Sequence, residues 1–210
     1  MMKIKTFVAG PVQANNYLVY DEDSKEAILI DCSDFVQEIV DIVTKEGLNV
    51  KYILLTHGHF DHVLGINSMK ETLRAKAYVH ESDEEQVAHT SEIMMMFGLP
   101  FNLDVNPKLD GTLKDVGRLT IGSNEIKVLE TPGHTEGCVC YLINDALFSG
   151  DTLFQGSVGR TDLPGGDFSA LRHSIKDVLF KLDENITVFP GHGDKTTIAY
   201  EKKFNDILNY

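Results

Sequence analysis

Three histidines and an aspartate crowd into six consecutive positions, and this crowding constrains the chain more than any other feature. Residues 57–62 have the sequence His-Gly-His-Phe-Asp-His, and the apolar run 52–56 precedes them. The run predicts a buried strand, and residues 63–74 predict the helix that follows. The four polar side chains would then lie at the carboxyl end of a strand, where open α/β sheets carry their binding sites.

The residue types in this turn are typical of metal ligands. Borderline divalent ions such as zinc prefer imidazole and carboxylate groups. His57, His59, Asp61 and His62 supply four such groups from one turn. Gly58 has no Cβ, so we expect the backbone to turn tightly enough for the first two histidines to face one point. Four ligands from one loop indicate two ions that share further ligands from elsewhere; the alternative is a solvated, hydrogen-bonded turn.

Three more residues of ligand type occupy the same kind of position. Each follows an apolar, β-rich run, and a glycine directly precedes each one: His134, Asp151 and His192. Two of these glycines belong to Pro-Gly pairs, which favour a sharp turn at a strand end. A lone histidine after a strand is usually only a hydrogen-bonded polar residue. Seven candidates in one repeated context favour a metal centre instead.

The complete set of seven residues resembles the ligand set of the metallo-β-lactamase superfamily. The stretch 154–167, Phe-Gln-Gly-Ser-Val-Gly-Arg-Thr-Asp-Leu-Pro-Gly-Gly-Asp, is similar to the glyoxalase II-like (hydroxyacylglutathione hydrolase-like) hydrolases that consist of the catalytic domain only. The resemblance implies an α/β fold, a four-layer αβ/βα sandwich with the metals at one edge of the paired sheets. The motifs run from Asp31 to His192, so residues 1–210 are expected to form a single catalytic domain.

The resemblance also implies a role for each residue. His57, His59 and His134 would hold the first ion, and Asp61, His62 and His192 the second. Asp151 would bridge the two, and Asp61 and Asp151 are the carboxylates expected to matter most for catalysis. Zinc is the expected metal, and iron or manganese also suits these nitrogen and oxygen ligands. A hydroxide shared by the ions would attack a substrate carbonyl.

Three residues outside the ligand set are candidates for supporting roles. Asp31, at a strand end, looks like the acid that orients a ligand histidine in this family, although an aspartate that only caps a turn fits equally well. Arg160 and Asp162 are expected to form an ion pair that braces the metal edge rather than to contact substrate.

Hydrolysis of a thioester is the reaction that this resemblance favours, because a thiolate leaves far more readily than an alkoxide. The substrate would be S-acylglutathione-like, S-lactoylglutathione being one example. Full-length glyoxalase II enzymes add a C-terminal extension that grips glutathione, whereas only residues 193–210 follow His192 here. A small bacterial-type thioesterase is therefore expected rather than a glutathione-specific enzyme.

Other members of the superfamily offer alternative functions. The closest rival is a persulfide dioxygenase with a single iron, whose members look similar through the metal motifs and the Gly-Arg-Thr-Asp stretch. Flavodiiron-type domains resemble this site but carry glutamate where His59 stands. A secreted β-lactamase is disfavoured because no signal peptide is recognisable and Asp151 stands where such enzymes often use cysteine. A non-catalytic domain stabilised by metal is the remaining class.

The composition and charge of the chain limit the kinds of molecule that it is expected to bind. The net charge is −13, with a pI near 4.9 and no cluster of lysine or arginine, which argues against a nucleic-acid-binding surface. Two divalent ions, two aspartates and a hydroxide would still leave the site itself with a charge of about +1, so an anionic small molecule could approach it. No apolar stretch is long enough to span a membrane. A cytoplasmic protein is expected, and the oligomeric state stays open.

The three cysteines are an odd number, which favours reduced and buried thiols. Cys138 and Cys140 flank one residue of a predicted strand, so their side chains should share a face. Cys32 stands where the resembling family usually has proline. A structural role is favoured for this thiol over a redox or metal-linked one.

Strands are expected at ten apolar runs, residues 4–8, 17–20, 27–31, 52–56, 77–80, 118–121, 126–129, 139–143, 146–149 and 186–189. Besides residues 63–74, helices are expected over 36–47, with Asp34 as the cap, over 168–182, with Asp167 or Ser169 as the cap, and over 196–208. Residues 84–117 fit this pattern least well. Their run Met94-Met95-Met96-Phe97-Gly98 indicates core or subunit packing, or alternatively a wall over the metals.

Overall fold

Alternating and continuous apolar runs in the N-terminal half of the chain build a six-stranded sheet in the computed structural model, which describes residues 1–99 and 106–210. Its strands lie side by side in chain order: β1 (Met2–Ala9), β2 (Ala14–Asp21), β3 (Glu26–Ile30), β4 (Asn49–Leu54), β5 (Lys76–Val79) and β6 (Gly111–Thr112). The first three are antiparallel, and β3, β4, β5 and β6 are parallel. Parallel strands require crossovers, which here run over one face of the sheet.

A second sheet of five strands comes from the C-terminal half. Its spatial order is β15-β14-β11-β10-β9. The strands are β9 (Lys127–Glu130), β10 (Val139–Ile143), β11 (Ala146–Gly150), β14 (Thr187–Pro190) and β15 (Thr196–Thr197). Two short hairpins accompany it, β7 (Thr120–Ile121) with β8 (Asn124–Glu125) and β12 (Leu153–Phe154) with β13 (Ser157–Val158).

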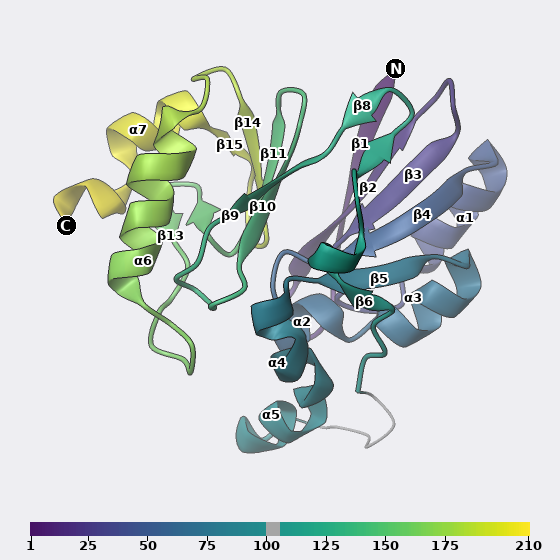
Figure 1. Ribbon diagram of the computed structural model, residues 1–210, viewed down its shortest axis with the longest axis horizontal. Coiled ribbons are helices and arrows are strands. Elements are labelled where there is room, and N and C mark those ends of the chain that lie inside the picture. The colour runs from purple at the N-terminus through teal and green to yellow at the C-terminus, as the bar shows by residue number, and fades with distance from the viewer. Residues whose placement is uncertain (100–105) are drawn as a thin grey trace.

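Helices cover the outer face of each sheet (Figure 1). On the first sheet lie α1 (Gln37–Glu46) and α3 (Ile66–Leu73), and on the second lie α6 (Phe168–His173), continued by the helical turns 174–181, and α7 (Ile198–Phe204). Three short helices lie near the lower edge of the sheets in this view: α2 (Phe60–Val63), α4 (Glu84–Ala88) and α5 (Thr90–Met96). Within the described residues, no helix has the length and apolar character needed to cross a bilayer.

Three apolar cores separate these layers. The first lies between the six-stranded sheet and its helices, and it includes Leu29, Ile53 and Ile66. The second, between the sheets, joins residues such as Leu54 and Phe148, and the third lies between the five-stranded sheet and its helices. Full burial of each large aliphatic or aromatic side chain contributes about 1.5–3 kcal/mol. Helix, sheet, sheet, helix is the predicted four-layer αβ/βα sandwich, and the prediction is confirmed.

Several predicted helix boundaries are wrong. The helix expected over 63–74 is divided into α2 and α3, because the Gly65 N–H donates to Cys32 O and docks this turn on the strand-end loop. Helix α1 begins after Val36 without a side-chain cap, while Asp34 Oδ1 accepts from the adjacent Phe35 N–H. Residues Thr196–Thr197 pair with β14 as strand β15, so the last helix begins only at Ile198. In the first and third cases, hydrogen bonds between distant residues override the helical periodicity.

The methionine run in the segment 84–117 divides between two environments. Met94 is buried, whereas Met95, Met96 and Phe97 are at least half exposed. The run is therefore neither wholly core nor wholly surface. Residues 100–105 of this segment lie outside the described part of the chain.

The sheet topology brings four loops to one edge. Strands β4, β11 and β14 each run toward this edge in a parallel arrangement within their sheets. Strand β9 points the same way as β11, because both are antiparallel to β10. The loops that follow these strands therefore converge, although they are far apart in the sequence.

Candidate metal centre

All seven predicted ligands lie together at this edge. Three groups of side chains have their ligand atoms within 4.8 Å of one another: His57, His59 and His134; His57, His62 and Asp151; and Asp61, His62 and His192. Six of the seven are buried, and His192 is partly exposed. The first and last groups are the two triads that the family resemblance implies.

Within each triad, nitrogen and oxygen lone pairs face one another at short range. His59 Nδ1 lies 2.8 Å from His134 Nε2. In the other triad, His192 Nε2 lies 3.3 Å from His62 Nε2 and 3.2 Å from Asp61 Oδ2. Such electron-rich atoms face one another favourably only when a proton or a cation lies between them.

Asp151 lies between the two triads. Its Oδ2 is 3.5 Å from His134 Nε2 and 3.6 Å from His192 Nε2, and its Oδ1 is 3.4 Å from His62 Nε2. One carboxylate thus reaches members of both groups. This is the position that a bridging ligand requires.

Three of the histidines are oriented from behind through Nδ1. His62 Nδ1–H donates to Asp31 Oδ2 over 2.9 Å, and His134 Nδ1–H donates to the Arg160 carbonyl over 2.7 Å. His57 Nδ1 lies 3.1 Å from Thr56 Oγ1. Because Nδ1 makes these hydrogen bonds, Nε2 is the ring atom that each of the three histidines presents to the centre.

Asp31 performs both of the roles considered for it. Besides His62, it accepts from the Thr56 N–H over 2.8 Å and from Thr56 Oγ1 over 2.9 Å. Its backbone is left-handed, with φ of 58°, a conformation that aspartate tolerates better than most residues. One buried carboxylate therefore caps the turn after β4 and links, through Thr56, to His57 as well.

Two observations test whether these residues fit a metal. Within the described residues, His57 Nε2 and Asp151 Oδ1 are buried without a hydrogen-bond partner, which costs about 1–3 kcal/mol each unless something else satisfies them. A Cβ on Gly191 would lie 2.1 Å from Asp151 Oδ1 and 2.8 Å from His62 Cε1, so only glycine lets the backbone approach. Buried nitrogen and oxygen atoms with unused lone pairs, set this close to the backbone of Gly191, fit a site for divalent cations.

Two histidines of the first triad, His57 and His59, are held in their metal-binding, neutral form. Burial lowers the pKa of His57 well below its usual range, and the neighbouring imidazoles of His62 and His134 act in the same direction. Burial also lowers the pKa of His59 to about 3, with His134 adding to the effect. Neutral imidazoles bind metal ions without first releasing a proton.

The other triad couples imidazoles to carboxylates. Burial opposes a charge on His62, but Asp31, Asp151 and Asp61 together raise its pKa well above the usual value. Burial likewise opposes ionisation of Asp61 and Asp151, yet the adjacent histidines lower the pKa of both carboxyl groups. Both aspartates are therefore ionised near neutral pH, the form in which they bind cations.

Asp83 is a supporting residue that the sequence reasoning missed. Its buried carboxylate accepts from the Gly58 N–H over 2.8 Å, from Thr135 Oγ1 over 2.7 Å and from the Gly137 N–H over 2.8 Å. It therefore joins the 57–62 turn to the loop that carries His134. His57 and His59 do face one point, as expected, but the φ of Gly58 is not positive. Glycine is required here because a Cβ would lie 2.9 Å from Asp83 O.

Asn15 supports the His192 loop and was also missed. Its side-chain N–H groups donate to Pro190 O over 2.9 Å and to Gly193 O over 3.0 Å, and its backbone N–H donates to Gly191 O. Asn15 is buried in β2, so this bond network crosses from one sheet to the other. A polar Asn-Asn pair at the start of an apolar strand was the available signal.

Arg160 and Asp162 form a bidentate ion pair, with N–O distances of 2.7 and 2.8 Å. Both side chains are more than half exposed, so solvent screens the pair and its contribution to stability is small. The support that this loop lends to the centre comes from the Arg160 backbone carbonyl, which accepts from His134.

The cysteines stay apart from the ligand groups. All three are free and buried, and burial raises the pKa of each thiol, to about 11 for Cys140. Cys32 is held by its backbone, which bonds to His62 O and Gly65 N–H. A buried, protonated thiol suits the structural role expected for Cys32.

A cavity of about 600 Å³ opens onto the centre. Five of the seven candidate ligands line it, His59, Asp61, His134, Asp151 and His192. A second cavity of about 540 Å³ adjoins it and shares His59, Phe60, Phe97 and Leu163 with it. Both sizes suit a small organic molecule.

Comparison with known proteins gives a consistent picture. Residues 9–192 match the family model described as "Metallo-beta-lactamase superfamily". A "Probable metallo-hydrolase YqgX" of Bacillus subtilis is 35% identical, covering 99% of this chain and 98% of that protein. A "Hydroxyacylglutathione hydrolase GloC" of Haemophilus influenzae is 34% identical, covering 99% of each.

Solved structures of similar proteins have the same fold. "BLEG-1 B3 metallo-beta-lactamase" superimposes with a TM-score of 0.88 at 35% identity, covering 99% of this chain and 100% of that one. "TTHA1623 in a di-iron-bound form" has a TM-score of 0.83 at 36% identity, covering 96% and 98%. Similarity over nearly whole chains accounts for the shared fold.

Proposed function

The chain belongs to the metallo-beta-lactamase superfamily, and from this premise we propose that it hydrolyses thioesters of small molecules with two divalent metal ions. It is a metal-binding hydrolase of that superfamily. The observation that carries the proposal is the meeting of two ligand triads around one shared carboxylate, Asp151.

His57, His59 and His134 would hold one ion, and Asp61, His62 and His192 the other. Asp151 would be their common ligand. When bound, such ions lower the pKa of a coordinated water to about 7 and place positive charge where a carbonyl oxygen gains negative charge. We propose zinc, and iron is the rival because a similar solved structure is titled di-iron-bound.

Residues around the ligands keep the ligand histidines in the orientation that metal binding requires. Asp31, Thr56 and the Arg160 carbonyl keep the Nδ1 atoms of three histidines occupied, so that each Nε2 is presented to the metals. Phe60 and Phe97 are apolar side chains that line both cavities beside the ligands. A thiol has a pKa near 8.5, so it can depart as the thiolate without a proton from the protein.

The remaining expectations belong to the same proposal. Residues 1–210 would act as one catalytic domain in the cytoplasm, with a small thioester rather than nucleic acid or a membrane as partner. The relative named as a hydroxyacylglutathione hydrolase supports an acylated thiol as substrate.

Metal analysis of the purified protein and an anaerobic assay on a thioester panel test the proposal. We expect two ions per chain and oxygen-independent cleavage, and we expect His59→Ala and Asp151→Ala to lose metal and turnover together. His173→Ala is the matched control, since this exposed histidine forms an ion pair with Asp177 and belongs to none of the ligand groups found in the described part of the chain. A single iron per chain with oxygen uptake on glutathione persulfide would instead identify a persulfide dioxygenase.

Cleavage of a β-lactam ring is a second candidate, because a structure with a TM-score of 0.88 is titled a B3 metallo-beta-lactamase. The same ligand set would serve an amide carbonyl. A chromogenic cephalosporin in the panel separates the two, and a kcat/KM above that of every thioester would favour the β-lactam.

A further inference from the structure

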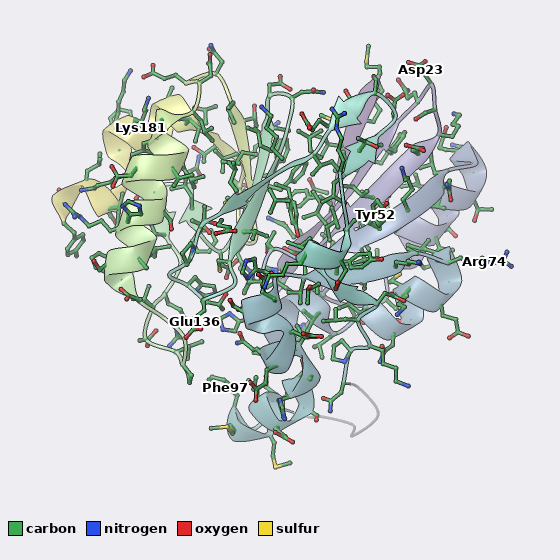
Figure 2. The ribbon with its side chains drawn as sticks, in the orientation of Figure 1. Asp23, Tyr52, Arg74, Phe97, Glu136 and Lys181 are labelled. Carbon is green, nitrogen blue, oxygen red and sulfur yellow. The ribbon has the colours of Figure 1, made fainter. Side chains whose placement is uncertain are left out.

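An apolar cavity lies directly beside the candidate metal centre. Its volume is about 540 Å³, and it lies between α5 and the turn that precedes α6. Five large apolar side chains line it, Phe60, Ile93, Met96, Phe97 and Leu163. Figure 2 labels two residues that line it, Phe97 toward the lower edge of the molecule and Glu136 above it.

The cavity adjoins the space above the ligands. His59, Phe60, Phe97 and Leu163 line both, and the rings of Phe60 and Phe97 lie 6.3 Å apart, centre to centre. Phe60 stands between the ligands His59 and Asp61 in the sequence. A chain attached to a carbonyl at the centre would therefore pass directly into apolar surroundings.

Charge in this cavity is negative. Glu85 and Glu136 are exposed at its rim, and Asp83 is engaged by its three hydrogen bonds. Neither lysine nor arginine is among the described residues that line it, and residues 77–107 contain neither residue type. The lining also includes the exposed imidazole of His89, whose Nδ1–H donates to the Glu85 carbonyl. An anionic group placed here would meet two carboxylates against at most one imidazolium.

We propose, on the basis of the thioester hydrolysis proposed above, that this cavity receives the acyl group and selects apolar, uncharged chains of about four to eight carbons. Lactoyl is too small and too polar to fill it, and a dicarboxylic acyl group is repelled by the two glutamates. Large, partly exposed apolar side chains such as Met96 and Phe97 are the surface that such a chain would cover.

Burying a methylene group contributes up to about fourfold in binding. The test uses the metal-loaded enzyme and N-acetylcysteamine thioesters, which keep the thiol neutral and constant while the acyl group varies. We expect kcat/KM to rise at least about tenfold from acetyl to hexanoyl or octanoyl, and to be lower for lactoyl and succinyl than for butyryl. A flat profile, or a preference for lactoyl or succinyl, would overturn the inference.

Pairs of variants, one inside the cavity and one outside it, test whether the cavity is the source of the acyl selectivity. Met96→Ser should lower the octanoyl-to-acetyl ratio of kcat/KM severalfold, whereas Met95→Ser, on the same helix but outside the cavity, should leave it unchanged. Glu136→Lys should raise the succinyl-to-butyryl ratio at least about tenfold, and Glu92→Lys, an exposed acid that does not line the cavity, should not.

Two further measurements distinguish other occupants. If chain length matters only when alkyl groups are added to the thiol, the cavity holds the leaving group and the inference is wrong. If Met96→Ser changes the oligomeric state but not the acyl profile, the patch is a contact between chains, which also overturns it. Equal turnover of all acyl groups would leave thioester hydrolysis intact, whereas no metal-dependent thioester cleavage would end both proposals.

Discussion

The residues behind the ligands determine how accurately the ligands are placed. Asp83 holds two loops at once, because its carboxylate accepts from Gly58 in one loop and from Thr135 and Gly137 in the other. These loops carry His59 and His134, whose nitrogens lie only 2.8 Å apart. A small displacement of either loop would change that separation.

Asp83→Asn should therefore weaken metal binding by the first triad about 10- to 100-fold, as changes behind metal ligands typically do. The amide cannot accept from all three donors, because one of its two positions is itself a donor. Competition with a chromophoric chelator measures the affinity. The control is Asp115→Asn, which removes an acceptor of Thr112 remote from the centre. Equal metal affinities in both variants would limit Asp83 to a structural role.

Among the elements, strand β2 of the first sheet positions a ligand loop of the second sheet. Through Asn15 it holds the loop after β14, which carries His192, while the next residue, Asn16, bonds to Phe7, Ala14 and Ser33 away from the ligands. Both neighbours are buried; the Asn15 side chain makes two hydrogen bonds and the Asn16 side chain makes four. They differ in whether the bonds reach a ligand loop.

We expect Asn15→Ala to weaken the second metal about tenfold or more while the first triad keeps its affinity. At limiting metal, the variant should bind one ion before the other, which isothermal titration resolves as two separated phases. Asn16→Ala, the control, should lower the free energy of unfolding by about 1–3 kcal/mol without separating the two binding phases. Simultaneous loss of both sites in Asn15→Ala would contradict this division of roles.

Across the whole molecule, the metal centre connects the two sheets. Two members of each triad come from residues 57–62, which follow strand β4 of the first sheet, and the remaining ligands follow strands of the second sheet: His134, Asp151 and His192. Cations held there would cross-link the two halves of the sandwich. Binding to the folded state alone adds about 2.7 kcal/mol of stability when free metal is 100 times its Kd.

Removing the metals should accordingly lower Tm by on the order of 5–10 °C for a chain of this size. Differential scanning calorimetry before and after chelation measures the shift, with the metal content determined on the same samples. Adding back zinc, manganese or iron should restore Tm, and the ion that restores turnover identifies the functional metal. An unchanged Tm in protein shown to be metal-free would contradict a cross-linking centre.

Much of the architecture was predictable, because the relevant signals are local. Apolar runs such as 139–143 form strands, as predicted. Helix α1 ends at Gly47, as predicted, and this glycine is left-handed. Asp167, one of the two predicted caps, caps α6 by accepting from the Ala170 N–H. The division between α2 and α3 was not predictable from periodicity. It depends on a hydrogen bond from Gly65 to Cys32, a residue on the far side of β4 and α1 in the sequence.

The candidate centre shows the same limit at the level of side chains. The sequence by itself determined the chemical types of the seven candidate ligands and their positions after strands, because strand, glycine and ligand are adjacent in the chain. The family resemblance implied how they pair, but only the tertiary structure decided that Asp83 and Asn15 hold their loops and that an apolar cavity adjoins them. These features depend on contacts between residues many positions apart, which form only when the two sheets pack and bring the loop ends to one edge.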